Sequence, residues 1–201
     1  MPHAKVPVVQ PPSLNRGDAV AITAPSSALR NDDSLHRGIA VFESWGLEVQ
    51  PHQLDARHWG YLAGTDQQRR ADLDQRQSPP LLACARGGWG AARLLEHPWP
   101  WSPGWLLGFS DITSLLCSRL AQGVGGGVHG PLVTTLADEP DWSQQRLQEL
   151  LFDRTAPDLH GESWVGGKAQ GPLITVNLTV ASHLLGSSHL PDLRGMILVI
   201  E

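Results

Sequence analysis

The chain passes from a strand pattern to a helix pattern within Gly104-Trp105-Leu106-Leu107-Gly108-Phe109-Ser110-Asp111-Ile112-Thr113. A short apolar run between glycines is typical of a buried strand in a parallel sheet, so residues 104–109 are predicted to form such a strand. The next apolar residues recur at helical spacing, and they are Ile112, Leu115, Leu116 and Leu120. Ser110 therefore stands at the corner between a strand and a helix.

A serine at such a corner points its hydroxyl out of a tight turn, beside the unpaired N–H groups that begin the helix. Those N–H groups can bind an oxyanion, and serine hydrolases built on a strand, a turn and a helix use this arrangement. Ser110 is therefore a candidate nucleophile. The alternative is that Ser110 only caps the helix, with Asp111 in its first turn, because the second glycine of the G-x-S-x-G motif is missing.

A second candidate loop follows another buried strand, at residues 81–85, and reads Arg86-Gly87-Gly88-Trp89-Gly90. Glycines at the carboxyl end of a strand let backbone N–H groups approach a ligand closely, and this is the edge of an open α/β sheet where ligands bind. The alternative is an ordinary glycine turn into a helix over residues 91–95.

Further apolar runs alternate with helical patterns along the chain, which predicts an α/β fold with a largely parallel sheet. We expect the strands to lie in chain order, with Ser110 at the carboxyl edge of the sheet. The predicted strands are residues 19–23, 47–50, 81–85 and 104–109. The predicted helices, besides those already given, begin near Asp32, at Asp66 and at Asp141 or Ser143.

Two connections have clear local signatures. Thr65-x-x-Gln68 has the form of a capping box, and the polar helix over residues 66–77 is predicted to be exposed. Residues 123–130 are rich in glycine and are predicted to be a flexible connection.

The composition changes after residue 154, and residues 157–171 are predicted to be a linker. We expect an N-terminal α/β domain over residues 1–157 and a partial C-terminal domain over residues 158–201. That second part should hold a strand at 173–176, a helix at 177–185 and a strand at 196–200. Because an apolar strand ends the chain at Glu201, we expect this end to be cut and the second domain to be incomplete.

The overall composition excludes several classes of function. With 201 residues, a net charge of -5 and no basic cluster, the chain is not expected to bind nucleic acid. It has no apolar leader and no 18-residue apolar run, so we expect a soluble, cytoplasmic protein without a membrane partner. Cys84 and Cys117 are predicted to be buried thiols. His52 and His58 match no standard ligand spacing, so no metal site is predicted.

Five motifs in this order resemble the LD-carboxypeptidase family of serine peptidases, which includes the microcin-immunity peptidases. The motifs are Ala24-Pro25-Ser26-Ser27, Arg86-Gly87-Gly88-Trp89-Gly90, Gly108-Phe109-Ser110-Asp111-Ile112-Thr113, His129-Gly130-Pro131 and Ile197-Leu198-Val199-Ile200-Glu201. The resemblance implies an N-terminal α/β domain similar to class I glutamine amidotransferases and a smaller, β-rich C-terminal domain, here truncated.

The resemblance also assigns residues to roles. It implies that Ser110 is the nucleophile, that Glu201 is the triad glutamate, and that the backbone N–H groups of Gly88 and Asp111 bind the oxyanion. Two motifs differ from the family pattern, at residues 175–178 and 186–188, which leaves the details of the C-terminal cleft undefined. The family's triad histidine lies beyond its glutamate, and no histidine of this chain occupies that motif.

The function implied by the resemblance is removal of the terminal D-amino acid from a murein tetrapeptide during cytoplasmic cell-wall recycling, without a cofactor. The implied partner is a small peptide substrate, and a homodimer is allowed. The alternatives are a peptidase of peptide conjugates of the microcin-immunity type, or a non-catalytic peptide-binding fragment. Without the triad histidine we expect little activity from these 201 residues. His129 is the nearest candidate for a substitute base, and a packing role in its loop is the alternative.

Overall fold

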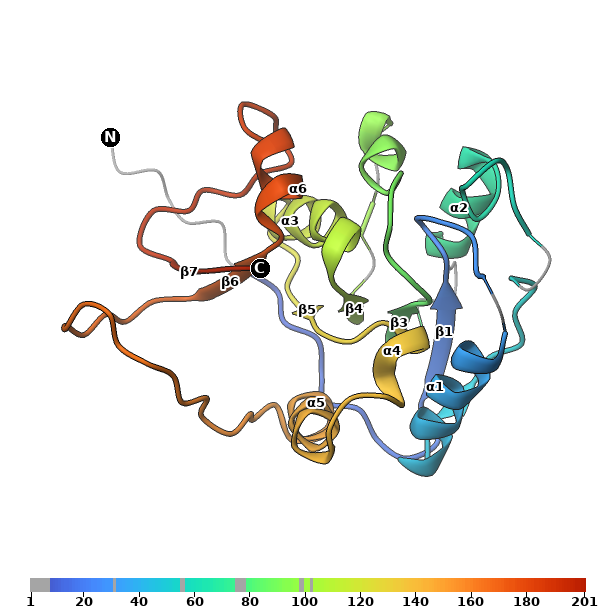
Figure 1. Cartoon of the computed structure of the whole chain (residues 1–201), viewed down its shortest axis with the longest axis horizontal. Coiled ribbons are helices and arrows are strands. Elements are labelled where there is room, and N and C mark those ends of the chain that lie inside the picture. The colour runs from blue at the N-terminus through green and yellow to red at the C-terminus, as the bar shows by residue number, and fades with distance from the viewer. Residues whose placement is uncertain (1–7, 31, 55–56, 75–78, 98–99, 102) are drawn as a thin grey trace.

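The computed structural model describes residues 8–30, 32–54, 57–74, 79–97, 100–101 and 103–201. Its central feature is a five-stranded, fully parallel sheet with the strand order β2-β1-β3-β4-β5 (Figure 1). The strands are β1 (Ala19–Thr23), β2 (Glu48–Val49), β3 (Leu81–Cys84), β4 (Trp105–Gly108) and β5 (Gly127–His129). The predicted parallel α/β sheet is therefore confirmed.

The expected order of the strands was wrong, because β1 lies between β2 and β3 and not at the edge. The burial of the strands explains the difference. β1 is buried along nearly its whole length, whereas β2 has only two residues and neither is buried. Parallel strands are joined by long crossover connections, which do not require consecutive strands to be neighbours. The short, polar β2 therefore lies at the edge of the sheet, where little of it has to be buried.

The expectation of a flexible connection at residues 123–130 was also wrong, because residues 127–129 form β5. This strand pairs with β4 in the register Leu106↔Gly127 and Gly108↔His129. Its glycine packs closely against α3 (Thr113–Ala121), since a Cβ on Gly127 would lie 3.2 Å from Leu116 Cδ2. A strand rich in glycine lacks the β-branched and aromatic residues by which strands are recognised.

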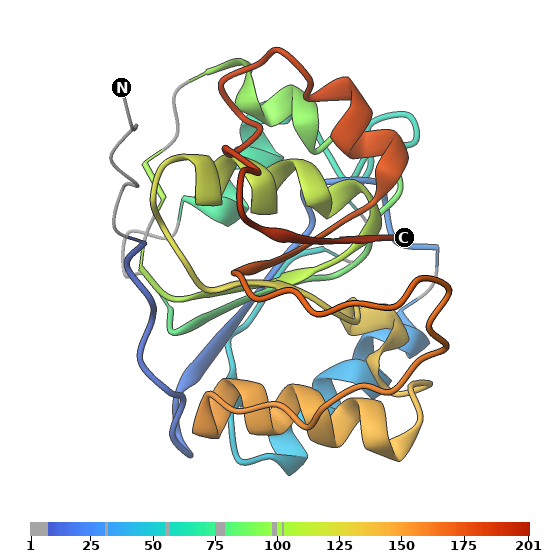
Figure 2. The same ribbon diagram turned by 90° about the vertical axis from the view of Figure 1, so that its left-hand side faces the viewer.

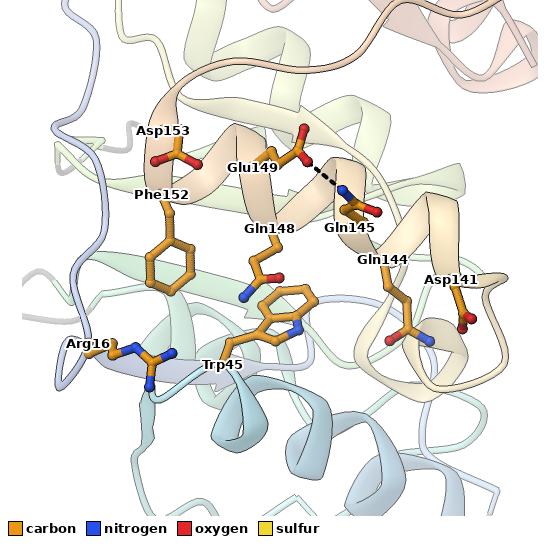
Figure 3. Close-up of a pocket in the computed structure, with 9 residues that line it drawn as sticks. All are labelled: Arg16, Trp45, Asp141, Gln144, Gln145, Gln148, Glu149, Phe152 and Asp153. Carbon is orange, nitrogen blue, oxygen red and sulfur yellow. Dashed lines mark hydrogen bonds between the residues drawn. The ribbon is translucent and has the colours of Figure 1, made fainter.

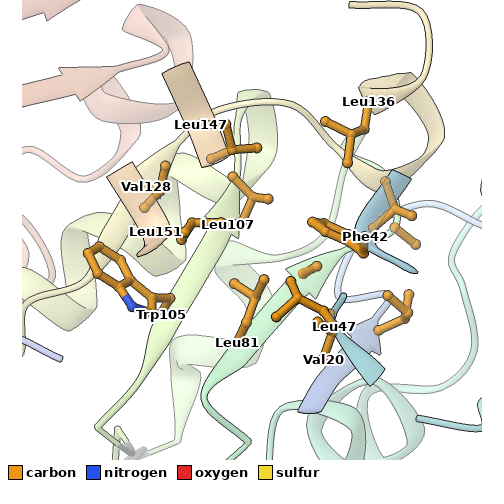
Figure 4. Close-up of a cluster of buried hydrophobic side chains, with 14 of the residues drawn as sticks. Val20, Phe42, Leu47, Leu81, Trp105, Leu107, Val128, Leu136, Leu147 and Leu151 are labelled. Atoms are coloured by element: carbon orange, nitrogen blue, oxygen red, sulfur yellow. The ribbon is translucent and has the colours of Figure 1, made fainter. Parts of the chain in front are cut away.

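Helices cover both faces of the sheet (Figures 1 and 2). On one face, α1 (Asp33–Ser44), α4 (Val133–Leu136) and α5 (Asp141–Asp153) pack over a core that includes Phe42, Leu81 and Leu107 (Figure 4). On the other face lie α2 (Asp66–Leu73), the 3₁₀ turns η1 (Ala92–Glu96) and η2 (Ser110–Ile112), and α3 (Thr113–Ala121). The central strands β1, β3 and β4 read as apolar runs because both of their faces are buried.

The capping box at the start of α2 is confirmed, since the Thr65 side chain accepts from the Gln68 N–H and the reciprocal bond is also present. The helix ends at Leu73, earlier than expected, and residues 75–78 lie outside the described residues. The expectation that this helix is exposed holds for one side only: Gln67, Gln68 and Ala71 are exposed, whereas Arg69 and Leu73 are buried.

The C-terminal part of the chain forms a second, smaller unit of secondary structure. Residues 155–172 contain no helix or strand, and then β6 (Leu173–Val176), α6 (Leu178–His183) and β7 (Ile197–Ile200) follow, with β6 and β7 parallel. Ile174, Val176 and Leu184 pack against Cys117 of α3. The boundary near residue 157, and the finer likeness to glutamine amidotransferases, stay predictions. Both cysteines are buried free thiols, as expected.

The close contact between α1 and α4 gives a first testable prediction. A Cβ on Gly38 of α1 would lie 1.8 Å from the Val133 carbonyl oxygen, and α4 cannot retreat freely because Thr134 bonds to the Ala85 carbonyl through both its N–H and its hydroxyl. Gly38→Ala should lower the free energy of unfolding by about 1–3 kcal/mol in urea titrations, although alanine favours a helix over glycine.

Ala40→Gly, at an exposed position of the same helix, is the matched control. It should cost about 1 kcal/mol through helix propensity alone. A Gly38→Ala protein as stable as the unchanged chain would contradict the predicted clash.

Candidate active site

The loops that carry most of the candidate residues leave the main sheet at its carboxyl edge. The loops after β1, β3 and β4 all leave from this edge because the three strands are parallel. In the order β2-β1-β3-β4-β5, β2 lies on one side of β1 and the later strands lie on the other, so the strand order switches between β1 and β3. Open α/β sheets bind ligands outside the carboxyl ends of the strands at such a switch point. Ser26 and Ser27 follow β1, and the glycine turn at residues 86–90 follows β3, on either side of this point.

Ser110 directly follows Phe109 at the end of β4 and has a left-handed backbone, with φ of 61°. This conformation costs a residue with a Cβ on the order of 1–3 kcal/mol and is concentrated at functional sites. The capping alternative is not observed, because α3 begins at Thr113 after Ile112 and has no side-chain cap. Ser110 therefore occupies a strained corner between strand and helix, as the nucleophile of a strand-turn-helix hydrolase does.

The glycine turn after β3 lies against this corner. A Cβ on Gly87 would be 3.2 Å from Ser110 Cβ and 3.4 Å from Ser110 Oγ. Gly88 has a φ of 113°, and a Cβ there would be 2.2 Å from Ser27 Oγ. The turn is held to the first loop because Ser27 N–H donates to the Gly87 carbonyl at 3.3 Å and Trp89 N–H donates to Ser27 Oγ at 3.2 Å.

These contacts bring two of the predicted site residues, Ser110 and Gly88, into adjoining turns. Gly88 lies outside every described helix and strand, so the sheet ladder does not use its N–H. Asp111, the other predicted donor of a backbone N–H, is the next residue after Ser110. The convergence of the two N–H groups on one oxyanion stays a prediction.

The side chain of Asp111 joins all three loops, which sequence reasoning missed. Its Oδ2 accepts a hydrogen bond from Ser26 Oγ at 2.7 Å and another from Ala91 N–H at 2.9 Å. Burial raises the pKa of this carboxyl above its ordinary value, opposed by these two bonds and by the charge of Arg69. In the sequence, an acid in the first turn of a helix has a sufficient local explanation, so nothing indicated this contact.

Arg69 of α2 binds the loops after β1 and β3, and this role was not predicted from the sequence either. Its buried guanidinium donates through Nη1 to the carbonyls of Pro25 and, at 2.8 Å, of Gly90, and through Nη2 to Asp66 at 2.6 Å. A guanidinium suits this task because its N–H groups form a rigid fork. The burial of a charged residue in a polar helix follows from the loops that fold over it.

Glu201 lies at this edge of the main sheet as well, next to His129. The two side chains meet at 3.1 Å between His129 Nε2 and Glu201 Oε2. His129 ends β5, and its ring lies 6.1 Å from the ring of Phe109, which precedes Ser110. No hydrogen bond joins Ser110 to either residue within the described part of the chain. Burial lowers the pKa of His129, and the charge and hydrogen bond of Glu201 oppose that shift.

These opposing effects on the pKa of His129 predict what happens when the charge of Glu201 is removed. In Glu201→Gln the pKa of His129 should fall further below its ordinary value of 6.5, because burial still disfavours the imidazolium and the opposing carboxylate is gone. Titration of the His129 ring signals by NMR measures the shift, with Glu162→Gln, at an exposed position, as the control. An unchanged or higher pKa would show that the contact is absent in solution.

A cavity of about 670 Å³ lies elsewhere, between α5 and the end of α1 (Figure 3). Arg16, Trp45, Asp141 and Phe152 are among its lining residues. Because Arg16 precedes β1, this cavity opens near the amino edge of the sheet. It is therefore separate from the candidate active site.

The described residues contain no group of three or more histidine, cysteine, aspartate or glutamate side chains placed to hold a metal ion. None of the helices in the described ranges has the length and apolar character that crossing a bilayer requires.

Comparisons with known proteins place the chain in a family. Residues 20–130 match the LD-carboxypeptidase N-terminal domain. A Synechocystis protein with a carboxypeptidase name is 46% identical over 200 residues, which cover 96% of this chain and 66% of the relative. The Bacillus subtilis "Probable murein peptide carboxypeptidase" is 32% identical, over 96% of this chain and 64% of its own length. The chain thus spans about two thirds of the length of these curated relatives.

Solved structures share the fold. MccF in complex with glutamyl sulfamoyl guanosine has a TM-score of 0.80 over 96% of this chain and 70% of its own, and its 19% identity supports the fold alone. A muramoyltetrapeptide carboxypeptidase from Oxalobacter formigenes has a TM-score of 0.70 and 27% identity, over 90% of this chain and 65% of its own. By its matched domain, its relatives and its fold, the chain belongs to the LD-carboxypeptidase family.

Proposed function

We propose that this chain carries the nucleophile of a serine carboxypeptidase that removes the terminal D-amino acid from murein tetrapeptides. The observation that carries the proposal is the left-handed Ser110 at the end of β4, with the glycine turn of residues 86–90 packed against it. The name of the Bacillus subtilis relative supports a murein peptide as substrate. A role in cytoplasmic cell-wall recycling is part of the same proposal.

In this mechanism Ser110 Oγ attacks the carbonyl carbon of the last peptide bond while a base accepts the hydroxyl proton. The N–H groups of Gly88 and Asp111 stabilise the negative oxygen that forms. The C–N bond then breaks, the departing amine takes the proton, and water hydrolyses the acyl-serine. The base is the histidine that the family pattern places beyond Glu201, and Glu201 orients it, by analogy with the acid of a Ser-His-acid triad.

The experiment that tests the proposal has two parts. Both parts use the chain extended through the family's C-terminal histidine motif, because none of its own histidines occupies that motif. A fluorophosphonate probe should label Ser110 of this protein, and mass spectrometry should find D-alanine released from a tetrapeptide that ends in it. A peptidyl-nucleotide conjugate is offered in parallel, because a peptidase of the microcin-immunity type would prefer it. Ser182→Ala, at an exposed serine of α6, is the matched control.

Each outcome separates the alternatives. Labelling of Ser110 with release of D-alanine supports the proposed carboxypeptidase. Labelling with cleavage of the conjugate alone would replace the murein substrate. A folded protein that binds the tetrapeptide but is not labelled would be a peptide-binding protein and would overturn the proposal.

A further inference from the structure

One ring nitrogen of His129 is hydrogen-bonded to a carboxylate, and the other is buried. Its Nε2 lies 3.1 Å from Glu201 Oε2, and its side chain is 14% exposed against 40% for Glu201. Its Nδ1 is buried and has no hydrogen-bond partner among the described residues. A carboxylate only accepts hydrogen bonds, so Nε2 must carry the proton of this contact.

The neutral ring satisfies this environment best. Burial disfavours the imidazolium, and a neutral imidazole has a single N–H. With that N–H on Nε2, the enclosed Nδ1 bears only a lone pair and no buried donor is left unpaired. The surroundings therefore select the tautomer that donates to Glu201.

The position of His129 connects this contact to the candidate nucleophile. His129 stands opposite Gly108 in the register of β4 and β5, and Gly130 N–H donates to the Gly108 carbonyl at 3.3 Å. Ser110 follows Gly108 by two residues. His129 is thus held by the strand pair that also carries the Ser110 corner.

Glu201, in contrast, directly follows β7 of the smaller sheet. Its N–H donates to the Val176 carbonyl at 3.0 Å, and its own carbonyl accepts from Leu178 N–H at 3.2 Å. These bonds hold its backbone to β6 and to the start of α6. Among the described residues, its side chain meets the main sheet at His129.

We propose that His129 is a positioning residue, whose Nε2–H holds the Glu201 carboxylate at the carboxyl edge of the main sheet, beside the Ser110 corner. The inference rests on the proposed function for its catalytic meaning, and it adds a residue that acts through Glu201 without touching the substrate. A residue of this kind needs a hydrogen-bond donor and does not need to gain or lose a proton.

Two substitutions separate these properties. His129→Gln keeps an N–H donor of similar reach but cannot act as a base, whereas His129→Leu keeps the bulk and removes the donor. The measurement is the rate at which a fluorophosphonate labels Ser110 in the protein extended through the family's C-terminal histidine motif, where Glu201 has the base to orient. His129→Leu should be at least about tenfold slower than the unchanged chain, and His129→Gln should recover most of that loss.

A double substitution and a control complete the experiment. His129→Leu should add little to the loss caused by Glu201→Gln, because both changes break the same contact. His183→Gln, at an exposed histidine of α6, should label like the unchanged chain. Equal rates for His129→Leu and the unchanged chain would overturn the inference. Equally slow His129→Leu and His129→Gln would also overturn it, and would make His129 a base.

A second measurement keeps the inference testable if Ser110 is never labelled, which would refute the proposed function. Hydrogen exchange of the Leu178 N–H reports on the order of Glu201, whose carbonyl it bonds. Exchange should be faster in His129→Leu than in His129→Gln. The same exchange rate in both variants would show that His129 does not hold Glu201.

Discussion

In the protein extended through the family's C-terminal histidine motif, Ser110→Ala is expected to abolish labelling by a fluorophosphonate and to lower peptide turnover on the order of 10⁴- to 10⁶-fold. The hydroxyl that attacks the carbonyl is then missing, so only binding and oxyanion stabilisation can still speed the reaction. Because the geometry around residue 110 is set by the strand and the turns beside it, the protein should remain folded. Ser182→Ala should label and turn over substrate like the unchanged chain.

Two substitutions of Ser110 measure the backbone strain at this corner. Ser110→Ala and Ser110→Gly both lack the hydroxyl, and they differ only in the Cβ that disfavours the φ of 61°. Ser110→Gly should therefore be more stable than Ser110→Ala by about 1 kcal/mol in urea titrations. If the alanine variant were the more stable of the two, the left-handed conformation would not exist in solution.

Asp111→Ala is expected to lower the free energy of unfolding by about 3 kcal/mol and to slow the labelling of Ser110. The change leaves the hydroxyl of Ser26 and the N–H of Ala91 buried without their acceptor, and each such group costs about 1–3 kcal/mol. The loops after β1 and β3 also lose their common link to the Ser110 turn.

Asp111→Asn separates the hydrogen bonds from the charge. It keeps an oxygen for both donors, so it should cost less than Asp111→Ala. The carboxyl of Asp111 has a raised pKa when folded, so the native state favours its protonated form. Its contribution to stability therefore declines as the pH rises from the ordinary pKa of 3.8 through the raised value, and this decline should be missing in Asp111→Asn.

The control for both changes is Asp138→Ala, which removes an exposed ion pair with Arg37. Exposed pairs of this kind contribute little to stability, so this variant should unfold almost like the unchanged chain. A loss of stability in Asp111→Ala no larger than in Asp138→Ala would contradict the role assigned to the buried carboxylate.

Local sequence patterns were sufficient to predict most of the strands and helices of the fold. The apolar runs at residues 19–23, 81–85 and 104–109 are strands, and the change of period after Ser110 marks the start of a helix. The capping box predicted from Thr65 and Gln68 is also present in the structure. These features depend on residues a few positions apart, and their periodicity is visible without knowledge of the rest of the chain.

The tertiary structure alone decided how these elements meet. The place of β1 inside the sheet, the pairing of β5 and the burial of Arg69 all depend on segments distant in the chain. Asp111 reaches Ser26 across 85 positions, and His129 reaches Glu201 across 72. No local period records such contacts, because the desolvation and hydrogen bonding that stabilise them arise only when the loops fold over one another.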